Sequence, residues 1–352
     1  MKILIRKEKN QQVAKGRQNR IMLILTLALS LVCSAGLIGC SNTGGSGKDK
    51  PGQSVDAVPV RVASLKGPTS IGLVDFIDGV EQGTATAQYG LYDFKIYGTA
   101  DEILPQLVSG DIDIALLPAN VASVLYNRTK GCISVININT LGVLYIVSAD
   151  ESLVSLDDLA GRTILMTGKG TTPEYVMDHL LKSKGLTDLV TLEYRSEATE
   201  LAAIISADPT AVALLPEPYV SVVTNKNPNL AARISLTDEW SQSLDGGQLV
   251  TGVTVVRTGF LNDHPEAVEE FITNHAASVE AVNHDPEAAA ELVVKYGIID
   301  NATVAAQAIP RCQLVCLTGS AMQKALGPYL DVLYQANPES IGGALPGEDF
   351  YF

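Results

Sequence analysis

The sequence predicts an α/β protein made of two doubly wound lobes that two strands join. From Val58 onward, short aliphatic strands alternate with capped helices, which is the pattern of βαβ units. The segments 113–120 and 211–218 share an Ala-Leu-Leu-Pro core in the same strand-to-helix context, so the halves look like one repeated unit. Two apolar stretches, Val143–Ser148 and Thr251–Arg257, flank the second half. We expect them to connect the lobes as a hinge.

The composition excludes several classes of protein. Of the 352 residues, 46% are hydrophobic and 18% are charged, which is typical of a globular chain rather than a disordered one. The chain has 25 Lys and Arg against 39 Asp and Glu, a net charge of −14. A nucleic-acid partner is not expected, because phosphate backbones are bound by clustered cations.

The first 39 residues predict a signal peptide. A basic stretch that ends at Arg20 is followed by an uncharged run, Ile21–Gly39. The run closes on Leu37-Ile38-Gly39-Cys40, which resembles the bacterial lipobox. We therefore expect Cys40 to be acylated and to anchor the chain to the membrane, and residues 40–57 to form a flexible tether.

Two alternatives for this leader stay open. The uncharged run of 19 residues is long enough to be a retained membrane helix beside a coincidental cysteine. Translation could also start at Met22 rather than Met1, although a start there would lose the positive charges.

Strand and helix signals divide the rest of the chain. Residues 58–145 and 253–352 are expected to form lobe 1, and residues 146–252 lobe 2. The long helices after Arg257 have no sheet of their own, so we expect them to pack on lobe 1. The expected strands are Val60–Ala63, Ile112–Leu117, Thr163–Met166, Val190–Tyr194 and Val212–Leu215. The expected helices cover 71–80, 99–110, 120–127, 155–161, 173–185, 265–283, 286–296 and 318–336, and two more are expected to begin near residues 196 and 219.

Four segments predict the binding site, because each ends a strand and begins a helix. They are Lys66–Ser70, Leu117–Asn120, Gly168–Thr172 and Leu215–Tyr219. In open α/β sheets, ligands bind beyond the carboxyl ends of the strands, near the free amides of helix N-termini. Two of the segments come from each lobe, as a closing cleft requires. The candidate ligand-binding residues are Lys66, Gly67, Thr69, Ser70, Pro118, Ala119, Asn120, Gly168, Lys169, Gly170, Thr171, Thr172, Glu217 and Tyr219.

These side chains suggest two kinds of ligand. Helix amides, hydroxyls, Lys66 and Lys169 favour an anion, whereas Glu217 could accept a hydrogen bond from an amine or ring N–H. Tyr219 could stack on a planar group. Each feature also has a structural interpretation: hydroxyls at helix starts are often caps, lysines are often solvated, and Glu217 could complement a helix dipole.

No catalytic or metal site is expected. The four histidines form no metal-binding pattern, and Cys132, Cys312 and Cys316 are an odd set that we interpret as buried thiols. Gly168-Lys169-Gly170-Thr171 lacks the spacing of a phosphate-binding loop. We therefore expect no cofactor, no metal and no enzymatic activity.

Several motifs resemble a known family. They are Ser109-Gly110-Asp111-Ile112-Asp113-Ile114-Ala115, Leu156-Asp157-Asp158-Leu159-Ala160-Gly161-Arg162-Thr163-Ile164, Gly170-Thr171, Lys184-Gly185-Leu186 and Ala213-Leu214-Leu215-Pro216-Glu217-Pro218. With them, residues 58–350 resemble the type II solute-binding proteins of ABC importers, in the branch that serves nitrate, alkanesulfonates, taurine and thiamine-precursor pyrimidines. Pyrimidine-synthesising relatives carry a Cys-rich motif and an active-site His, and the sequence has neither.

The resemblance implies a fold and a function. The fold would be the type II periplasmic-binding fold, with two Rossmann-like lobes joined by a hinge. The chain would be a monomer on the extracytoplasmic face of a bacterial membrane, where it captures a small organic anion or heteroaromatic solute. It would deliver the solute to a permease driven by an ATPase. Two alternatives remain, a sensory lipoprotein that signals to a receptor kinase or chemoreceptor, and an enzyme on the same fold.

Overall fold

The computed structural model describes residues 57–208, 210–244 and 247–352. The predicted signal peptide, Cys40 and the tether up to residue 56 lie outside the described residues. Within the described ranges, no helix combines the length and apolar character needed to cross a membrane.

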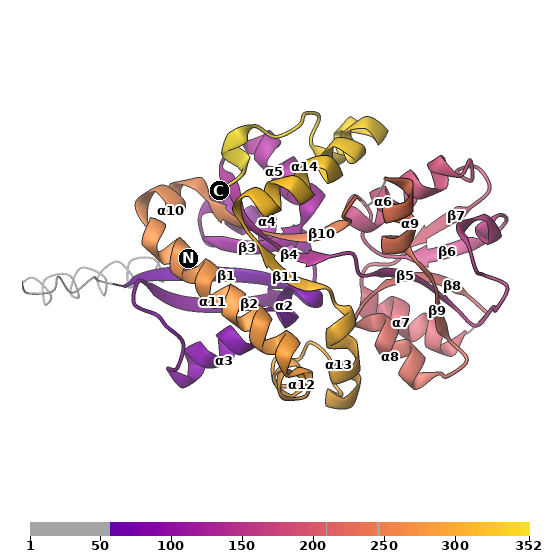
Figure 1. Cartoon of the computed structure of the whole chain (residues 1–352), viewed down its shortest axis with the longest axis horizontal. Helices are drawn as coiled ribbons and strands as arrows, with labels where there is room; N and C mark the ends of the chain where they lie inside the picture. The colour runs from indigo at the N-terminus through magenta and orange to yellow at the C-terminus, as the bar shows by residue number, and fades with distance from the viewer. Residues whose placement is uncertain (1–56, 209, 245–246) are drawn as a thin grey trace, which may run out of the picture. The chain divides into compact units, whose positions relative to one another are not determined.

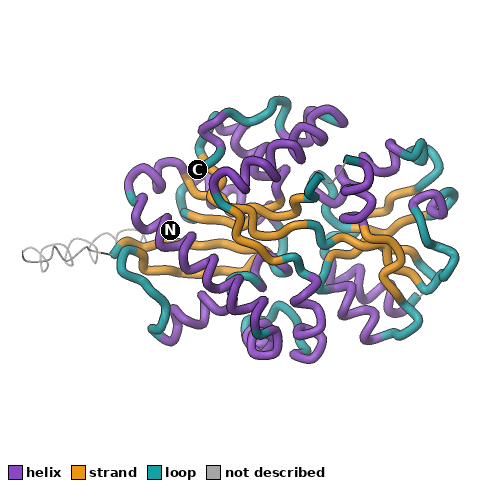
Figure 2. The backbone as a smooth tube through the Cα atoms, viewed as in Figure 1, coloured by secondary structure: helices purple, strands orange, loops and turns teal. Residues whose placement is uncertain are grey.

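The strands form two separate sheets (Figure 1, Figure 2). The first has six strands in the order β11-β4-β10-β3-β1-β2, and the second has five in the order β7-β6-β8-β5-β9. The first sheet contains β1 (Val58–Leu65), β2 (Gly90–Tyr97), β3 (Ile114–Pro118), β4 (Ile133–Leu141), β10 (Val250–Arg257) and β11 (Leu314–Leu317). The second contains β5 (Leu144–Ser148), β6 (Thr163–Met166), β7 (Thr191–Tyr194), β8 (Val212–Pro216) and β9 (Ala231–Ser235).

Helices surround each sheet. The first lobe is the six-stranded sheet with α2 (Pro68–Ile71), α3 (Val74–Gln82), α4 (Ala100–Ser109), α5 (Ala119–Thr129), α10 (Thr258–Asp263), α11 (Pro265–His284), α12 (Pro286–Lys295), α13 (Ala302–Ala308) and η2 (Ile309–Arg311). The second lobe is the five-stranded sheet with η1 (Leu156–Leu159), α6 (Thr172–Ser183), α7 (Ala198–Ala207), α8 (Tyr219–Lys226) and α9 (Leu236–Ser243). The C-terminal segment contains α14 (Gly319–Ala336), η3 (Pro338–Ile341) and η4 (Glu348–Phe350).

Both sheets are mixed rather than wholly parallel. β1 is parallel to β2 and β3, and β6 is parallel to β7 and β8. The two crossing strands run against their neighbours: β10 is antiparallel to β3 and β4, and β5 is antiparallel to β8 and β9. The edge strand β11 is also antiparallel to its neighbour β4, so the antiparallel pairs involve the two crossing strands and this edge.

The chain crosses between the sheets at two places. β4 ends at Leu141 in the first sheet and β5 begins at Leu144 in the second, so only Gly142 and Val143 lie between. The return runs from the end of α9 to the start of β10 at Val250. Against our expectation, β10 joins the first sheet three residues before the predicted boundary at residue 253.

Helix α14 differs from the prediction that all late helices pack on lobe 1. Its buried face includes Leu326, Tyr329 and Leu333, which share one apolar core with Met177 of α6 and Trp240 of α9. The ring centroids of Tyr329 and Trp240 lie 5.5 Å apart. The sequence shows that α14 is amphipathic, but it does not show that the partners of its apolar face come from both lobes.

A buried polar chain crosses the first sheet. Thr140 Oγ1 donates to Asn139 Oδ1 (2.9 Å), and Asn139 Nδ2 donates to Thr254 Oγ1 (3.1 Å). Thr254 Oγ1 donates to Asn137 Oδ1 (2.7 Å), and Asn137 Nδ2 lies 3.2 Å from Nδ1 of the fully buried His275 on α11. Each residue of this chain has at least one partner, which offsets much of the cost of burying polar groups, but Nε2 of His275 has none among the described residues.

Candidate functional site

A cavity of about 390 Å³ opens where the parallel strands of both sheets end. Each of β1, β2, β3, β6, β7 and β8 contributes its last residue or the residues that follow it, and the two crossings form the remaining wall. The position agrees with the rule that ligands bind at the carboxyl ends of such strands. The lining residues are Leu65–Thr69, Gly98–Asp101, Pro118, Thr140, Val143, Leu144, Thr167–Lys169, Thr171–Pro173, Arg195–Thr199, Pro216, Tyr219, Thr251 and Gly252.

Most of the candidate residues reach this wall, and five do not. Those that line the cavity are Lys66, Gly67, Thr69, Pro118, Gly168, Lys169, Thr171, Thr172 and Tyr219. The candidates outside the lining are Ser70, Ala119, Asn120, Gly170 and Glu217. Their side chains, where they have polar ones, are engaged elsewhere in the protein.

Ser70 serves the local turn. Its hydroxyl lies 2.6 Å from the Leu65 carbonyl oxygen and 2.6 Å from Ser64 Oγ. Thr69 Oγ1 also donates to the Leu65 carbonyl oxygen, at 2.9 Å, but its side chain remains in the cavity wall. The hydroxyls of this turn therefore satisfy a backbone carbonyl at the end of β1. This agrees with the alternative that such hydroxyls cap local backbone groups rather than bind a ligand.

Glu217 requires the main correction. Its side chain is fully buried, and its Oε1 lies 2.6 Å from Arg311 Nη2. Its Oε2 accepts from the backbone N–H of Ser221 (3.1 Å). Burial raises the pKa of this carboxyl, and Arg311 opposes that shift. The expectation that Glu217 accepts a hydrogen bond from a ligand amine is replaced by a role in joining η2 to the second lobe.

Two loops of the wall were missed in the sequence analysis. Gly98–Asp101 follows β2. The sequence does not predict β2 as a strand, because Asp93 and Lys95 alternate with aromatic residues in it. Arg195–Thr199 follows β7, which was predicted as a strand. Because β7 ends at Tyr194, the tendency of ligands to bind at the carboxyl ends of strands is the signal that marks this second loop.

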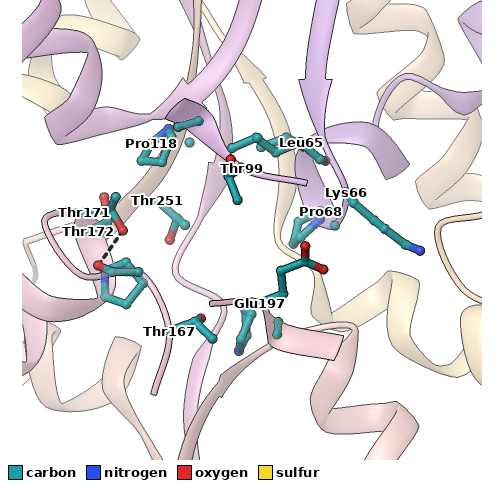
Figure 3. A pocket seen from close by; sticks show the side chains of 18 of the residues that line it. Leu65, Lys66, Pro68, Thr99, Pro118, Thr167, Thr171, Thr172, Glu197 and Thr251 are labelled. Carbon is teal, nitrogen blue, oxygen red and sulfur yellow. Dashed lines mark hydrogen bonds between the residues drawn. The ribbon is translucent and has the colours of Figure 1, made fainter. Parts of the chain in front are cut away.

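The wall is rich in hydroxyls and contains charges of both signs. Figure 3 shows Thr99, Thr167 and Thr251 around one space, with Thr171 and Thr172 at one side. Lys66, Lys169 and Arg195 supply positive charge, whereas Asp101 and Glu197 supply negative charge. Such a wall can bind a polar molecule that carries an anionic group together with hydrogen-bond donors.

The three cations differ in their surroundings. Lys169 Nζ lies 5.5 Å from the centre of the Tyr194 ring. Arg195 donates from Nη1 to the Tyr194 carbonyl oxygen (3.0 Å) and lies 3.4 Å from Glu193. Lys66 has no hydrogen bond or ion pair to another described side chain, and it extends away from the other labelled groups in Figure 3. Among the described residues neither lysine ammonium forms a hydrogen bond or an ion pair, so Lys66 and Lys169 both remain able to bind an anion.

Tyr219 stands at the start of α8 and is almost fully buried. Burial raises its pKa to about 12, and Glu197 and Asp300 add to the effect. The phenol therefore stays neutral at physiological pH and can both donate and accept a hydrogen bond.

The histidines and cysteines of the described residues lie away from this wall. Among the described residues that line the cavity there is no histidine or cysteine, and the described ranges contain no group of three or more His, Cys, Asp or Glu placed to hold a metal ion. Cys132, Cys312 and Cys316 are free thiols outside the wall, but only Cys312 is fully buried as expected, whereas Cys132 and Cys316 are half-buried. Burial raises the pKa of Cys312 and Cys316.

The chain matches one protein-family profile. The family is described as NMT1/THI5 like, and the match covers residues 93–289, more than half of the chain. It includes both crossings, the whole second lobe and the part of the first lobe from β2 to α12. No curated protein sequence matches the chain significantly.

Solved structures show the same fold at low sequence identity. An ABC transporter protein from Parabacteroides distasonis has 23% identity and a TM-score of 0.70, over 84% of this chain and 99% of that one. The aliphatic sulphonate-binding protein SsuA of Escherichia coli has 12% identity and a TM-score of 0.64, over 84% and 96%. SsuA of Xanthomonas axonopodis pv. citri, bound to MOPS, has 15% identity and a TM-score of 0.61, over 79% and 93%. The predicted two-lobed periplasmic-binding fold is thereby confirmed.

Proposed function

The chain belongs to the NMT1/THI5-like family, and from that premise we propose that it is the solute-binding component of an ABC importer. The observation that carries the proposal is the cavity at the strand ends, because its wall comes from both lobes and from both crossings. A molecule held there contacts both lobes at once. Its binding energy therefore favours the closed arrangement, which a permease can recognise.

We further propose that the ligand is a small organic anion or an anion-bearing heteroaromatic molecule. Lys66, Lys169 and Arg195 favour an anionic group, and the threonine hydroxyls favour further polar contacts. With Glu217 removed from the wall, Glu197 and Asp101 become the acceptors for an amine. The solved relatives named for sulfonate binding are consistent with this class.

Binding without turnover is part of the proposal. The ionisable groups of the described wall are lysines, an arginine, two carboxylates and the neutral phenol of Tyr219. These groups can position a solute by charge and hydrogen bonds, and the proposed role needs no covalent step.

The membrane anchor is proposed from the sequence alone. An uncharged run followed by Leu37-Ile38-Gly39-Cys40 favours acylation of Cys40, which would hold the binding lobes at the outer face of the cell membrane beside the permease and its ATPase. Metabolic labelling with a palmitate analogue should label the wild type and not Cys40→Ser. Equal labelling of the two would contradict the anchor.

The ligand can be identified directly. The chain should be purified, examined by native mass spectrometry, and then denatured so that any bound small molecule is released and identified. Thermal unfolding should be repeated with taurine, an alkanesulfonate and an aminopyrimidine. We expect a released solute or a raised Tm with one of these compounds, and Lys66→Met should weaken binding. If no solute is released and no compound raises the Tm, importer function in this solute class is excluded.

Exposed Lys226 on α8 provides a matched control. It lies outside the cavity wall, so Lys226→Met removes the same charge without touching the site. Equal weakening of ligand binding by Lys66→Met and Lys226→Met would show that only the net charge matters.

A further inference from the structure

Asn120 links three parts of the protein. It lies in the first turn of α5, and its side chain is fully buried. Its Nδ2 donates to the carbonyl oxygens of Gly170 (3.2 Å) and Ser340 (3.1 Å), and its Oδ1 accepts from Thr172 Oγ1 (3.3 Å). One amide of the first lobe is thus bonded to a cavity loop of the second lobe and to the C-terminal segment.

Tyr329 of α14 continues this network. Its hydroxyl donates to Thr172 Oγ1 (3.3 Å), and its ring packs against Trp240 of the second lobe. The bonds from Thr172 to Asn120 and from Tyr329 to Thr172 are both 3.3 Å long, above the usual O–H···O distance of about 2.7–2.8 Å. The two bonds that Asn120 Nδ2 donates are shorter, so we expect them to contribute more to the stability of this contact. Burial adds to their importance, because a buried polar group without a partner is costly.

The loop held in this way is part of the cavity wall. Gly168–Thr172 contributes Lys169, Thr171 and Thr172 to the lining. Its other polar bonds stay within the loop and the start of α6: Thr171 Oγ1 donates to the Gly168 carbonyl oxygen, and the Gly170 N–H donates to Glu174 Oε2. Among the described residues, Asn120 and Tyr329 supply the polar side chains that bond this loop from outside the second lobe.

We infer that the C-terminal segment 319–341 is a clasp between the lobes, and that Asn120 is the positioning residue through which it fixes the Gly168–Thr172 loop. Asn120 contacts no ligand itself, since it lies outside the wall. It determines where Lys169, Thr171 and Thr172 stand when the lobes are together. The consequence for solute capture depends on the proposed function, whereas the clasp itself does not.

Hydrogen exchange of the whole chain without added ligand tests the clasp. Asn120→Ala removes the bonds to Gly170, Ser340 and Thr172. We expect amides in peptides that cover Gly168–Tyr175 to exchange about five- to tenfold faster, as does the peptide that covers Ser340–Ala344. Because no ligand is present, a failure of the proposed function leaves this result unaffected.

Asn127 is the matched control on the same helix. Its Nδ2 donates to the carbonyl oxygens of Ile341 (2.8 Å) and Ala344 (2.7 Å), both in the C-terminal segment, and it makes no hydrogen bond to the described residues of the second lobe. Asn127→Ala should therefore speed exchange at 340–344 and leave 168–175 unchanged. If both variants speed exchange at 168–175 equally, or if neither does, Asn120 is not a positioning residue for the loop.

Thr172→Val keeps the test decisive if Asn120→Ala does not fold. The substitution preserves shape but removes the hydroxyl that bonds Asn120 and Tyr329. We expect exchange at 168–175 to become about two- to threefold faster, because only the two long bonds are lost. Unchanged exchange there would overturn the clasp.

Discussion

Arg311 Nη2 and Glu217 Oε1 lie 2.6 Å apart and connect the two lobes on the side of α13 and η2. The Glu217 side chain is fully buried, whereas that of Arg311 is 46% exposed. Nearby, Asn225 Nδ2 of α8 donates to Gln307 Oε1 of α13 (3.1 Å). The lobes are therefore bonded at this edge as well as at Asn120, so the cavity is flanked by contacts between them.

Removing the cation should leave a buried carboxylate without its charge partner. We expect Arg311→Leu to lower the free energy of unfolding by about 2 kcal/mol, less than a fully buried pair would lose because Arg311 is half exposed. Adding Glu217→Gln should recover about half of the loss. Urea unfolding at neutral pH measures each value.

Arg162 and Asp150 form an ion pair of the same length, 2.6 Å, in which both side chains are partly exposed. Arg162→Leu should therefore cost clearly less than Arg311→Leu. Equal losses in the two variants would show that burial of Glu217 does not determine the strength of the interaction.

The burial of His275 is expected to make the folded protein less stable in mild acid. Complete burial lowers the pKa of His275 to about 4, below the ordinary value of 6.5. The unfolded chain takes up this proton first as the pH falls, so stability decreases from about pH 6.5 down to pH 4. Between pH 7.5 and pH 5, wild type should lose about 2 kcal/mol more than His275→Gln.

His284 lies on the same helix and is exposed, so it serves as the control. His284→Gln should retain the full pH dependence of the wild type in urea unfolding. A pH dependence of His275→Gln that matches the wild type would assign the acid sensitivity to other groups.

Gly252 should tolerate no side chain. It lines the cavity on β10, and an added Cβ would lie 2.5 Å from Asn139 Oδ1 and 3.1 Å from Thr69 Cγ2. Gly252→Ala would therefore push Asn139 out of the buried polar chain. We expect a loss of about 1–3 kcal/mol in the free energy of unfolding.

Gly327 is the contrasting position inside α14, where an added Cβ meets no described atom within 4 Å apart from the adjacent residues and the backbone of its own helix. Gly327→Ala should change the free energy of unfolding by less than about 1 kcal/mol, because the helix preference of alanine is opposed by the contact of its Cβ with the ring of Pro328. A stabilised Gly252→Ala variant would mean that β10 and β4 can separate to admit the methyl group.

Glu270 holds the chain that leads into β2. Its carboxylate accepts from the backbone N–H groups of Gln88 (2.6 Å) and Gly90 (3.0 Å) and from the Tyr92 hydroxyl (3.0 Å). Glu270→Gln turns an NH₂ group toward these donors and should cost about 2–3 kcal/mol of stability. The adjacent exposed Glu269 provides the control, since Glu269→Gln should change the Tm very little. Equal Tm changes would exclude a special role for Glu270.

The local elements were largely predictable from local signals. The strand Thr163–Met166 has the predicted bounds, and the helix expected to begin at Ser155 starts there with a capping box formed by Ser155 and Asp158. β4 was missed because Asn137 and Asn139 make its sequence look polar. Their burial depends on Thr254 and His275, which lie more than 100 residues further along the chain.

The cavity was predictable in position but not in every side chain. Lys66, Thr171 and Tyr219 reach the wall because they follow strand ends. Glu217 also follows a strand end, yet its side chain turns to Arg311, 94 residues later. Local sequence places a residue at the end of a strand, whereas distant pairing determines which way its side chain points.

Small-angle scattering tests the central claim that a solute is held between the lobes. The chain should be freed of any co-purified solute by partial unfolding and dialysis, refolded, and measured before and after the identified solute is returned. The account predicts a smaller radius of gyration when the solute is present, because its contacts draw the lobes together. An unchanged scattering profile at saturating solute would contradict it.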